Sequence, residues 1–261
     1  MEQSVADYLD VPHILGAVGQ VYPRSLDLQV VGALVQLASG PANFALSVRL
    51  MAGHDLATEG FGAGQVGSSA MPHKMNTRSC ERINGLFTVL RGYLTMASSL
   101  AGDQWNEGDV SCSVVRRIVL PDAFFAVDGL METSFAVLNQ FGVFPQVIDN
   151  ELRRYLPFLA TTKLLTHAVQ NGLGREQAHE LVKSHAVAAA LAMREGNGDG
   201  LQLVRRLADD QAFPGTEDEL LAVVNDVSVG AVESQVANFC AKVDAITEGR
   251  PESTYRGADI L

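Results

Sequence analysis

The strongest constraint on the fold is a helical spacing of apolar residues that recurs along most of the chain. Between residues 78 and 101 the apolar side chains return every three or four positions, which places them along one face of a helix. Arg82 and Arg91 fall on the opposite face of that helix. No segment shows a convincing alternation of apolar and polar residues that would predict a strand. The sequence therefore predicts an all-α protein.

The expected helices form two groups on either side of residues 142–145, where a glycine and a proline predict a stop and a linker. Those of the first group are long and typical of a bundle: 26–37, 43–51, 78–101 and 113–141. We expect Gly40 and Pro41 to separate the first two, because proline lacks the N–H that a helix interior uses. The second group predicts a compact helical domain: 146–155, 159–171, 175–194, 201–209, 216–224 and 230–248. The predicted domains are residues 1–143 and 144–261.

Composition indicates a soluble protein with a substantial core. Of 261 residues, 47% are hydrophobic and 19% are charged, which excludes disorder as the main state. The formal net charge of −11 argues against a nucleic-acid-binding protein, which usually has a basic surface. The longest uninterrupted apolar stretch, 186–193, is shorter than the roughly 18 residues of a membrane span, and no leader-like segment opens the chain. We therefore expect a cytoplasmic protein that binds neither a membrane nor a nucleic acid.

Three patterns that often indicate a cofactor site or a metal site do not predict one in this sequence. The cysteines are too few and too widely spaced for a disulfide framework or a metal site, so we expect buried or unreactive thiols at Cys80, Cys112 and Cys240. Residues 62–67 match G-x-G-x-x-G, but no strand precedes them as a dinucleotide site requires. His179 and His185 stand six residues apart and face different sides of a helix, whereas a zinc pair stands four apart. No cofactor and no metal are implied.

The charge is distributed unevenly along the chain. Residues 68–117 carry six basic and four acidic side chains, a net charge of +2, which leaves −13 for the rest. A cationic segment in an acidic protein indicates a site for an anion. The alternative is chance clustering of charges on a solvated face.

Residues 67–76, GSSAMPHKMN, form the most informative segment. A glycine-hinged loop presents two hydroxyls, an ammonium and an amide just before the long helix, where helix N–H groups also point outward. This arrangement suits the binding of a carboxylate or a phosphate. The alternative is a polar loop that caps the helix through Asn76 or Thr77.

The letters G-S-S-x-M-P-x-K-x-N resemble the signature of the fumarase/aspartase superfamily, whose members eliminate fumarate from a succinyl adduct. Three segments are similar to the adenylosuccinate lyase family, and most to its actinobacterial type: the MPHK form, residues 104–117 (QWNEGDVSCSVVRR) and residues 19–24 (GQVYPR). The resemblance implies a carbon–nitrogen lyase of purine biosynthesis. It would release fumarate from adenylosuccinate to give AMP, and from the succinylocarboxamide ribotide SAICAR. It also implies a long-helix bundle followed by a compact C-terminal helical domain.

The resemblance implies roles for five residues of the signature loop. Ser68 is the expected general base, activated by loop closure, by the positive charge of Lys74 and by helix N–H groups. Lys74 and Asn76 are expected to grip the succinyl carboxylate, on which negative charge develops during proton abstraction. Ser69 and Met71 would supply further contacts from the loop.

Five more residues match substrate-binding or catalytic positions of the family. Glu81 matches a position that pairs with the general-acid histidine of a neighbouring subunit, although a glutamate in a first helical turn is also favoured by the helix dipole alone. Arg82 and Gln20 match substrate contacts. Ser113 and Arg117 match a phosphate clamp, for which the fork of an arginine is suited. Each active site would be shared between three subunits of a homotetramer that binds a small nucleotide substrate.

The chain departs from the family pattern at two positions. Thr77 replaces a proline, which we expect to change only the helix cap, and Gly108 replaces an arginine, so that nucleotide contact cannot be carried over. Arg116, next to the expected clamp, points elsewhere on its helix and is expected to be structural.

None of the six histidines matches the general acid of the family, whose motif lies N-terminal to everything in this sequence. The chain thus resembles the C-terminal portion of the enzyme, and we expect it to have negligible lyase activity by itself. Two alternatives stay open. One is another fumarate-releasing lyase or carboxymuconate cycloisomerase, whose substrates need no phosphate clamp; the other is a noncatalytic helical assembly fragment.

Overall fold

The computed structural model describes residues 1–19, 21–60, 71, 74–103, 110–255 and 257. Its regular structure consists of helices and of two strands of two residues each, which confirms the all-α prediction. The chain divides into two compact units. Unit 1 contains Met1–Val143 and the chain from Tyr255 onward, and unit 2 contains Phe144–Thr254.

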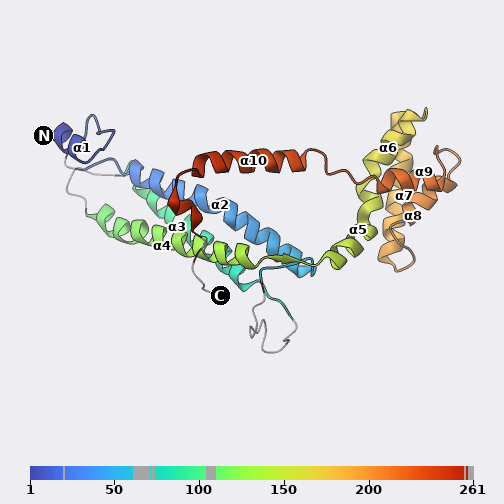
Figure 1. Cartoon of the computed structure of the whole chain (residues 1–261), viewed down its shortest axis with the longest axis horizontal. Helices are drawn as coiled ribbons and strands as arrows, with labels where there is room; N and C mark the ends of the chain where they lie inside the picture. The colour runs from blue at the N-terminus through green and yellow to red at the C-terminus, as the bar shows by residue number, and fades with distance from the viewer. Residues whose placement is uncertain (20, 61–70, 72–73, 104–109, 256, 258–261) are drawn as a thin grey trace. The chain divides into compact units, whose positions relative to one another are not determined.

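Three long helices build unit 1 (Figure 1), and a short one, α1 (Glu2–Tyr8), precedes them. They are α2 (Ser25–Gly53), α3 (Arg78–Leu100) and α4 (Ser111–Gln140). Two contacts show that α3 runs antiparallel to the other two helices. A hydrogen bond from Arg49 to Asn84 joins the end of α2 to the start of α3. An ion pair between Asp27 and Arg116 joins the starts of α2 and α4. This up-down-up order fixes which helix ends meet.

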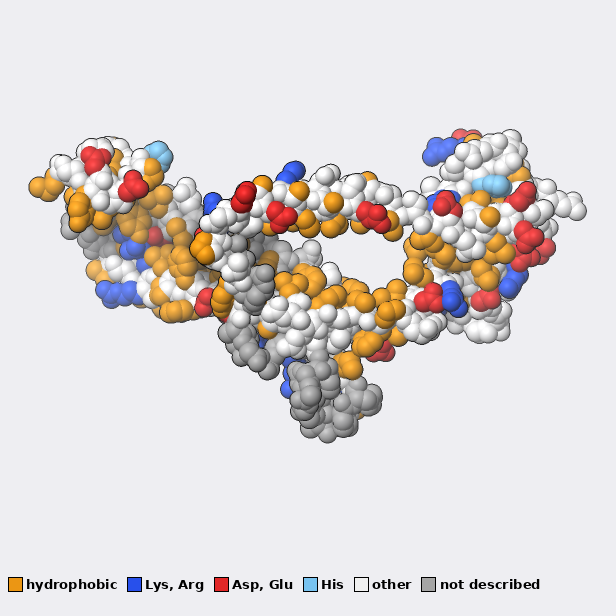
Figure 2. Space-filling view, in the orientation of Figure 1, with side chains coloured by type: hydrophobic (Ala, Val, Ile, Leu, Met, Phe, Trp, Pro, Cys, Tyr) orange, Lys and Arg blue, Asp and Glu red, His pale blue; other side chains and the backbone are white. Residues whose placement is uncertain are grey.

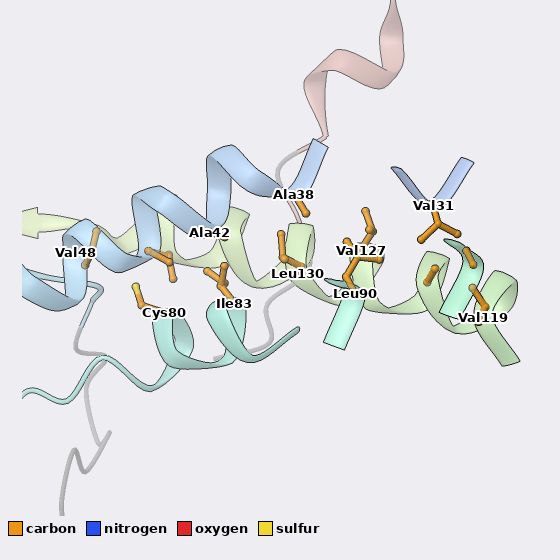
Figure 3. Packing of buried hydrophobic residues seen from close by; sticks show 14 residues of the cluster. Val31, Ala38, Ala42, Val48, Cys80, Ile83, Leu90, Val119, Val127 and Leu130 are labelled. Atoms are coloured by element: carbon orange, nitrogen blue, oxygen red, sulfur yellow. The ribbon is translucent and has the colours of Figure 1, made fainter. Parts of the chain in front are cut away.

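The core of unit 1 forms where the apolar faces of the three helices meet (Figure 3). Val31 and Val48 of α2, Ile83 and Leu90 of α3, and Leu130 of α4 are each at most 1% exposed. Small buried residues let α2 approach its neighbours closely: Ala38, Ala42 and Ala45. The apolar spacing of residues 78–101 thus packs as its period predicts.

The predicted helix break at Gly40 and Pro41 is wrong, since α2 continues through both residues. A proline in a helix interior costs about 3 kcal/mol. Here buried residues before and after the proline pack into the core, and Asn84 Nδ2 of α3 donates a hydrogen bond to the Ala42 carbonyl at 2.7 Å. Tertiary packing therefore outweighs the local preference.

Helix α2 is apolar on more than its buried face. Among the described helices it alone has the length and hydropathy to cross a membrane by composition, and it also supplies one side of the unit 1 core. Its exposed apolar residues add to the apolar surface of unit 1, part of which is visible in Figure 2: Val30, Leu37, Leu46 and Leu50. Counting uninterrupted apolar residues did not identify this helix as long and apolar enough to cross a membrane, because small and amide side chains interrupt its apolar runs.

A two-stranded antiparallel pair joins the end of α4 to the segment after α2. Strand β1 (Ala57–Thr58) pairs with β2 (Gly142–Val143), with Ala57 opposite Val143. No alternating pattern predicted this pair, because two residues are too few to show a period. It fixes the segment that leads into the signature loop.

Unit 2 contains the shorter helices, of which α5–α9 pack together: α5 (Pro145–Leu159), α6 (Thr161–Gln170), α7 (Arg175–Arg194), α8 (Gln202–Asp209), α9 (Glu217–Asn225), α10 (Val232–Thr247) and the 3-10 helix η1 (Pro251–Thr254). Its core contains the fully buried Leu164, Leu203, Leu207 and Leu220. Thr216 and Glu219 form a capping box at the start of α9. Helix α10 contributes no buried residue.

The end of the chain belongs to unit 1, whereas the sequence prediction assigned residues 144–261 to one domain. The Tyr255 hydroxyl donates a hydrogen bond to Glu132 of α4, and its ring meets Phe135 edge-on at 5.9 Å between centroids. A return of the chain to an earlier helix leaves no periodic signal in the sequence.

Leu130→Ala tests the core of unit 1. Removing a fully buried leucine costs about 2–5 kcal/mol of the free energy of unfolding, because a cavity is left. The matched control is Leu138→Ala on the same helix, where the side chain is 56% exposed. Hydrogen exchange of α3 amides should report the loss for Leu130→Ala, with α7 amides of unit 2 as an unaffected reference. Equal effects of the two variants would contradict this packing.

Asp210→Asn tests an electrostatic contact in unit 2. His185 Nε2 lies 2.8 Å from Asp210 Oδ2, and the Ala212 N–H donates to Oδ1 at 2.9 Å. These bonds, that of His185 foremost, hold the pKa of Asp210 below its ordinary value of 3.8. Because the pKa is lower in the folded than in the unfolded chain, the contact stabilises unit 2 at neutral pH, and this contribution is lost as the pH falls below the ordinary value.

Thermal unfolding followed against pH measures this contribution. Asp210→Asn should unfold at a lower temperature than the wild type at neutral pH and should lose less stability on acidification from about pH 5 to pH 2. Asp209→Asn, at the exposed neighbouring position, is the matched control. The same acid dependence in Asp210→Asn as in the wild type would exclude the contact as its source.

Candidate functional site

The described candidate residues all lie in unit 1, in two groups at opposite ends of its helices. Three further candidates, Gln20, Ser68 and Ser69, lie outside the described residues. The first group lies at the start of α3: Met71, Lys74, Asn76, Glu81 and Arg82. The second group lies at the start of α4: Ser113 and Arg117.

The group at the start of α3 is largely open to solvent. Lys74, Glu81 and Arg82 are exposed and Asn76 is half-buried. The Lys74 N–H donates to the Met71 carbonyl at 3.0 Å, which makes a turn just before the helix. Thr77 occupies the N-cap position, but its side chain makes no capping hydrogen bond. The exposed ammonium of Lys74 is therefore accessible to an anionic ligand.

A buried carboxylate from a distant part of the chain caps α3. Glu59, only 3% exposed, accepts hydrogen bonds from the backbone N–H groups of Ser79 and Cys80 at 2.9 and 2.8 Å. These donors stand at the positive end of the helix dipole, where a carboxylate is stabilising. The expectation that the N–H groups of this helix point outward to an anion is thus wrong for these two, because Glu59 already occupies them.

Glu59 also determines the environment of Cys80. Burial, together with a hydrogen bond to Glu59 and the charge of that carboxylate, raises the pKa of the Cys80 thiol. The neutral thiol is therefore the stable form, and thiolate chemistry is disfavoured. Cys112 is likewise buried, as expected from the sequence, whereas Cys240 is exposed.

The group at the start of α4 presents a hydroxyl and a guanidinium on one side of the helix. Ser113 is half-buried and Arg117 is exposed. They stand four residues apart and are therefore neighbours on the helix surface. This spacing allows both to reach one oxyanion.

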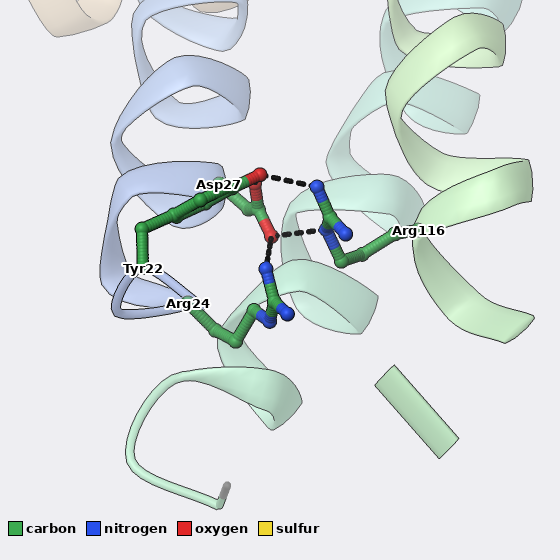
Figure 4. A network of polar contacts seen from close by, with 4 residues as sticks. All are labelled: Tyr22, Arg24, Asp27 and Arg116. Carbon is green, nitrogen blue, oxygen red and sulfur yellow. Dashed lines mark hydrogen bonds and ion pairs between the residues drawn. The ribbon is translucent and has the colours of Figure 1, made fainter. Parts of the chain in front are cut away.

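Arg116 points away from that side and links α4 to α2 (Figure 4). Its Nε donates to Asp27 Oδ2 at 2.7 Å, and its Nη2 meets the hydroxyl of Tyr22. The Tyr22 hydroxyl donates to Asp27 Oδ1 at 2.8 Å, and burial with this hydrogen bond raises the pKa of Tyr22. Asp27 is 5% exposed, so this contact is protected from water. This geometry agrees with the structural role expected for Arg116.

The two groups are far apart within one chain. Helix α3 begins beside the first group and ends near the start of α4, and its 23 residues span about 34 Å. Figure 1 shows the same up-down-up course of α2, α3 and α4. Lys74 and Arg117 of one chain therefore cannot hold the same small ligand.

Two structural carboxylates of this region were not predicted from the sequence. Glu59 is a single acidic residue in a glycine-rich segment, and Asp27 is a single acidic residue in an otherwise apolar run. An acidic residue in the first turn of a helix, as Asp27 is in α2, could have been recognised as a helix-dipole contact. No local pattern indicates Glu59, because its partners stand about twenty positions further along the chain.

Comparison with known proteins finds similar proteins for both units. Residues 157–239 match the family described as Adenylosuccinate lyase C-terminus. The chain is 30% identical over 243 residues to adenylosuccinate lyase of Saccharomyces cerevisiae, which covers 93% of this chain and 50% of the relative. It is also 30% identical over 228 residues to that of Pyrococcus abyssi, covering 86% and 49% respectively. The chain thus spans about half the length of the curated relatives it matches.

Two solved structures of other enzymes share the fold. A 3-carboxy-cis,cis-muconate lactonizing enzyme from Pseudomonas putida superposes with a TM-score of 0.73 at 20% identity, covering 94% of this chain and 53% of that one. A fumarate lyase from Mesorhizobium sp. BNC1 gives a TM-score of 0.67 at 17% identity, covering 95% and 52%. At these identities the structures establish the fold alone.

Glu59→Gln tests the buried cap of α3. The amide would keep the volume but would replace one acceptor oxygen by a donor and remove the charge, so we expect a loss of about 1–3 kcal/mol of the free energy of unfolding. Faster hydrogen exchange at the Ser79 and Cys80 amides would locate the loss at the cap. Glu81→Gln, an exposed change in the same helical turn, is the control and should leave those amides protected. Unchanged exchange in Glu59→Gln would refute the cap.

Proposed function

We propose that this chain forms part of an adenylosuccinate lyase. It carries the C-terminal domain of that family and is homologous to adenylosuccinate lyases over most of its length. The reaction is β-elimination of fumarate from adenylosuccinate to give AMP, with the parallel step on SAICAR. The observation that supports a shared active site is the separation of the two candidate groups along α3.

In this proposal the start of α3 handles the succinyl part of the substrate. Ser68 removes the proton next to the carboxylate, and the exposed Lys74 with Asn76 stabilises the negative charge that develops there. Ser69 and Met71 add loop contacts, and Arg82 adds a further cation. Preorganised cations lower the barrier because the charge on the carboxylate is greatest in the transition state.

The start of α4 handles the phosphate in the same proposal. Ser113 and Arg117 stand on one side of the helix, and a guanidinium can bind phosphate oxygens in pairs. This pair favours a nucleotide over the substrates of other fumarate-releasing lyases or of the cycloisomerase. A noncatalytic assembly would not need the exposed cations Lys74 and Arg117.

Different copies of the chain would bring the two groups together. One chain separates Lys74 from Arg117 by most of the length of α3, so a complete site takes the first group from one copy and the second from another. We propose a homotetramer whose sites draw on three subunits. Exposed apolar residues on the unit 1 helices support such packing: Leu37, Leu46 and Leu50 of α2, Val89 and Met96 of α3, and Val114, Ile118, Phe124 and Phe125 of α4.

The general acid would come from outside the 261 residues. None of the six histidines of the sequence stands at the position that the family resemblance assigns to the acid. Glu81, exposed in the first turn of α3, would orient and charge that histidine. We therefore propose that this chain, by itself, binds substrate without cleaving it efficiently.

Mixed oligomers test the shared site. Lys74→Met and Arg117→Met should each lower the affinity for adenylosuccinate by about 10–100-fold, because each removes a charge-assisted hydrogen bond. When the two variants are co-expressed, some sites combine an intact Lys74 with an intact Arg117 and recover wild-type affinity, as calorimetry would show. If no tight sites return although the variants co-assemble, the two groups do not share a site.

An absorbance assay tests the chemistry. The purified chain should cleave adenylosuccinate at a negligible rate, and co-expression with the N-terminal half of the yeast lyase, which supplies the missing acid, should raise that rate. Ser68→Ala in the same co-expressed pair is the control and should abolish the gain. Rapid cleavage by the chain alone would overturn the proposal that the acid lies elsewhere.

A further inference from the structure

Glu59 is a buried carboxylate to which the proposed reaction gives no role. It is 3% exposed, and within the described part of the chain its hydrogen-bond partners are neutral donors: the backbone N–H groups of Ser79 and Cys80, and the Cys80 thiol. Removing a carboxylate from water is unfavourable. Its place in the fold therefore needs a reason beyond the capping of one helix.

A cap of α3 does not require a residue from a distant part of the chain. Thr77 occupies the N-cap position, where a threonine hydroxyl commonly accepts from an N–H group of the first turn. The Thr77 side chain makes no capping hydrogen bond, and Glu59 accepts from these N–H groups in its place. A local cap would fix only the helix start. A cap from Glu59 also ties the helix start to the segment that carries Glu59.

That segment is fixed to the end of α4 on both sides of Glu59. Before Glu59, Thr58 of β1 pairs with Gly142 of β2, which begins two residues after α4 ends. After Glu59, Gly60 has a φ of +116° and lies so close to α4 that a Cβ on this glycine would overlap the Cβ of Gln140. Glu59 therefore links the start of α3 to the end of α4.

We propose that Glu59 is a positioning residue for the elimination: it holds the start of α3, and with it Lys74 and Glu81, in one place against α4. Lys74 stands three residues before the N-cap residue and so lies within about 11 Å of it. The Glu81 N–H donates to the Thr77 carbonyl at 2.9 Å in the first turn of α3. Both residues would move with the helix start. Their catalytic roles rest on the proposed function, whereas the link from Glu59 to α4 does not.

A shift of Lys74 and Glu81 should slow the reaction more than it weakens substrate binding. The negative charge on the succinyl carboxylate is greatest in the transition state, so the ammonium of Lys74 must be in place at that moment. A displacement of about 1 Å can cost about 100-fold in rate. Loss of Glu59 should therefore lower kcat and leave KM nearly unchanged.

Restoring a local cap separates the position of the helix start from its stability. Glu59→Gln removes the charge and one acceptor oxygen. Adding Thr77→Asp to this variant supplies a carboxylate at the N-cap, where aspartate is among the most favourable residues, but restores no link to α4. Leu130→Ala is the matched control, because it destabilises unit 1 from a fully buried position of α4 and keeps Glu59 in place.

The whole chain of each variant is measured for its unfolding temperature and, co-expressed with the N-terminal half of the yeast lyase, for kcat and KM with adenylosuccinate. Glu59→Gln should lower the unfolding temperature and should lower kcat by about 10–100-fold, with KM within about threefold of wild type. The double variant with Thr77→Asp should regain the unfolding temperature but not kcat. Leu130→Ala should lose stability and keep kcat at a temperature where it is folded.

A spin label reports the position of the segment before α3 without any catalysis. Met75 is 42% exposed and adjacent to Lys74, and Met75→Cys in a Cys240→Ser chain gives one accessible site, because the other two cysteines are buried. The label should move faster in Glu59→Gln and in the double variant than in the wild type. Its motion in Leu130→Ala should equal that in the wild type.

Three results would overturn the proposal. The double variant could regain kcat together with stability, which would make Glu59 a cap and nothing more. Leu130→Ala could lose as much kcat as Glu59→Gln, or the label could move equally in Glu59→Gln and the wild type. Failure of the lyase proposal has a different signature: the wild-type pair would not cleave adenylosuccinate, and the label spectra alone would then decide whether Glu59 fixes the segment before α3.

Discussion

The antiparallel packing of α3 between α2 and α4 decides where the described candidate residues lie. Apolar faces built from Val31, Ile83, Leu90 and Leu130 hold the three helices side by side. Because α3 reverses direction, the segment before it lies at one end of unit 1 and the start of α4 at the other. A single chain therefore presents two separate groups, which we propose bind a carboxylate and a phosphate respectively.

Buried carboxylates fix the two ends of this arrangement. Glu59 caps α3 where the signature loop rejoins the bundle, and Asp27 joins the starts of α2 and α4 through Arg116. Both are at most 5% exposed, so water does not compete with their partners. The fold thus holds the helix ends rigidly while the charged side chains, such as Lys74 and Arg117, stay exposed.

The long helices could be predicted because their apolar period extends over many turns, as in α3 and α4. The predicted helix break at Pro41 was wrong because the burial of residues on both sides of it is a tertiary effect. The return of Tyr255 to α4 leaves no local signal in the sequence. Resemblance of short motifs identified Lys74, Ser113 and Arg117 as candidates. It could not place them at opposite ends of α3, nor find the contacts of Glu59 with α3 and of Arg116 with Asp27, because these join residues distant in the chain.

Distances between spin labels at positions 74 and 117 test this separation most directly. Cysteines introduced there can be labelled after Cys240→Ser, because the other two cysteines are buried. A chain labelled at both positions and diluted with unlabelled chains should give a distance of roughly 25–35 Å, set by α3. Mixing singly labelled chains should give a much shorter distance between copies. A short distance within the diluted double-labelled chain, or none between copies, would contradict the account.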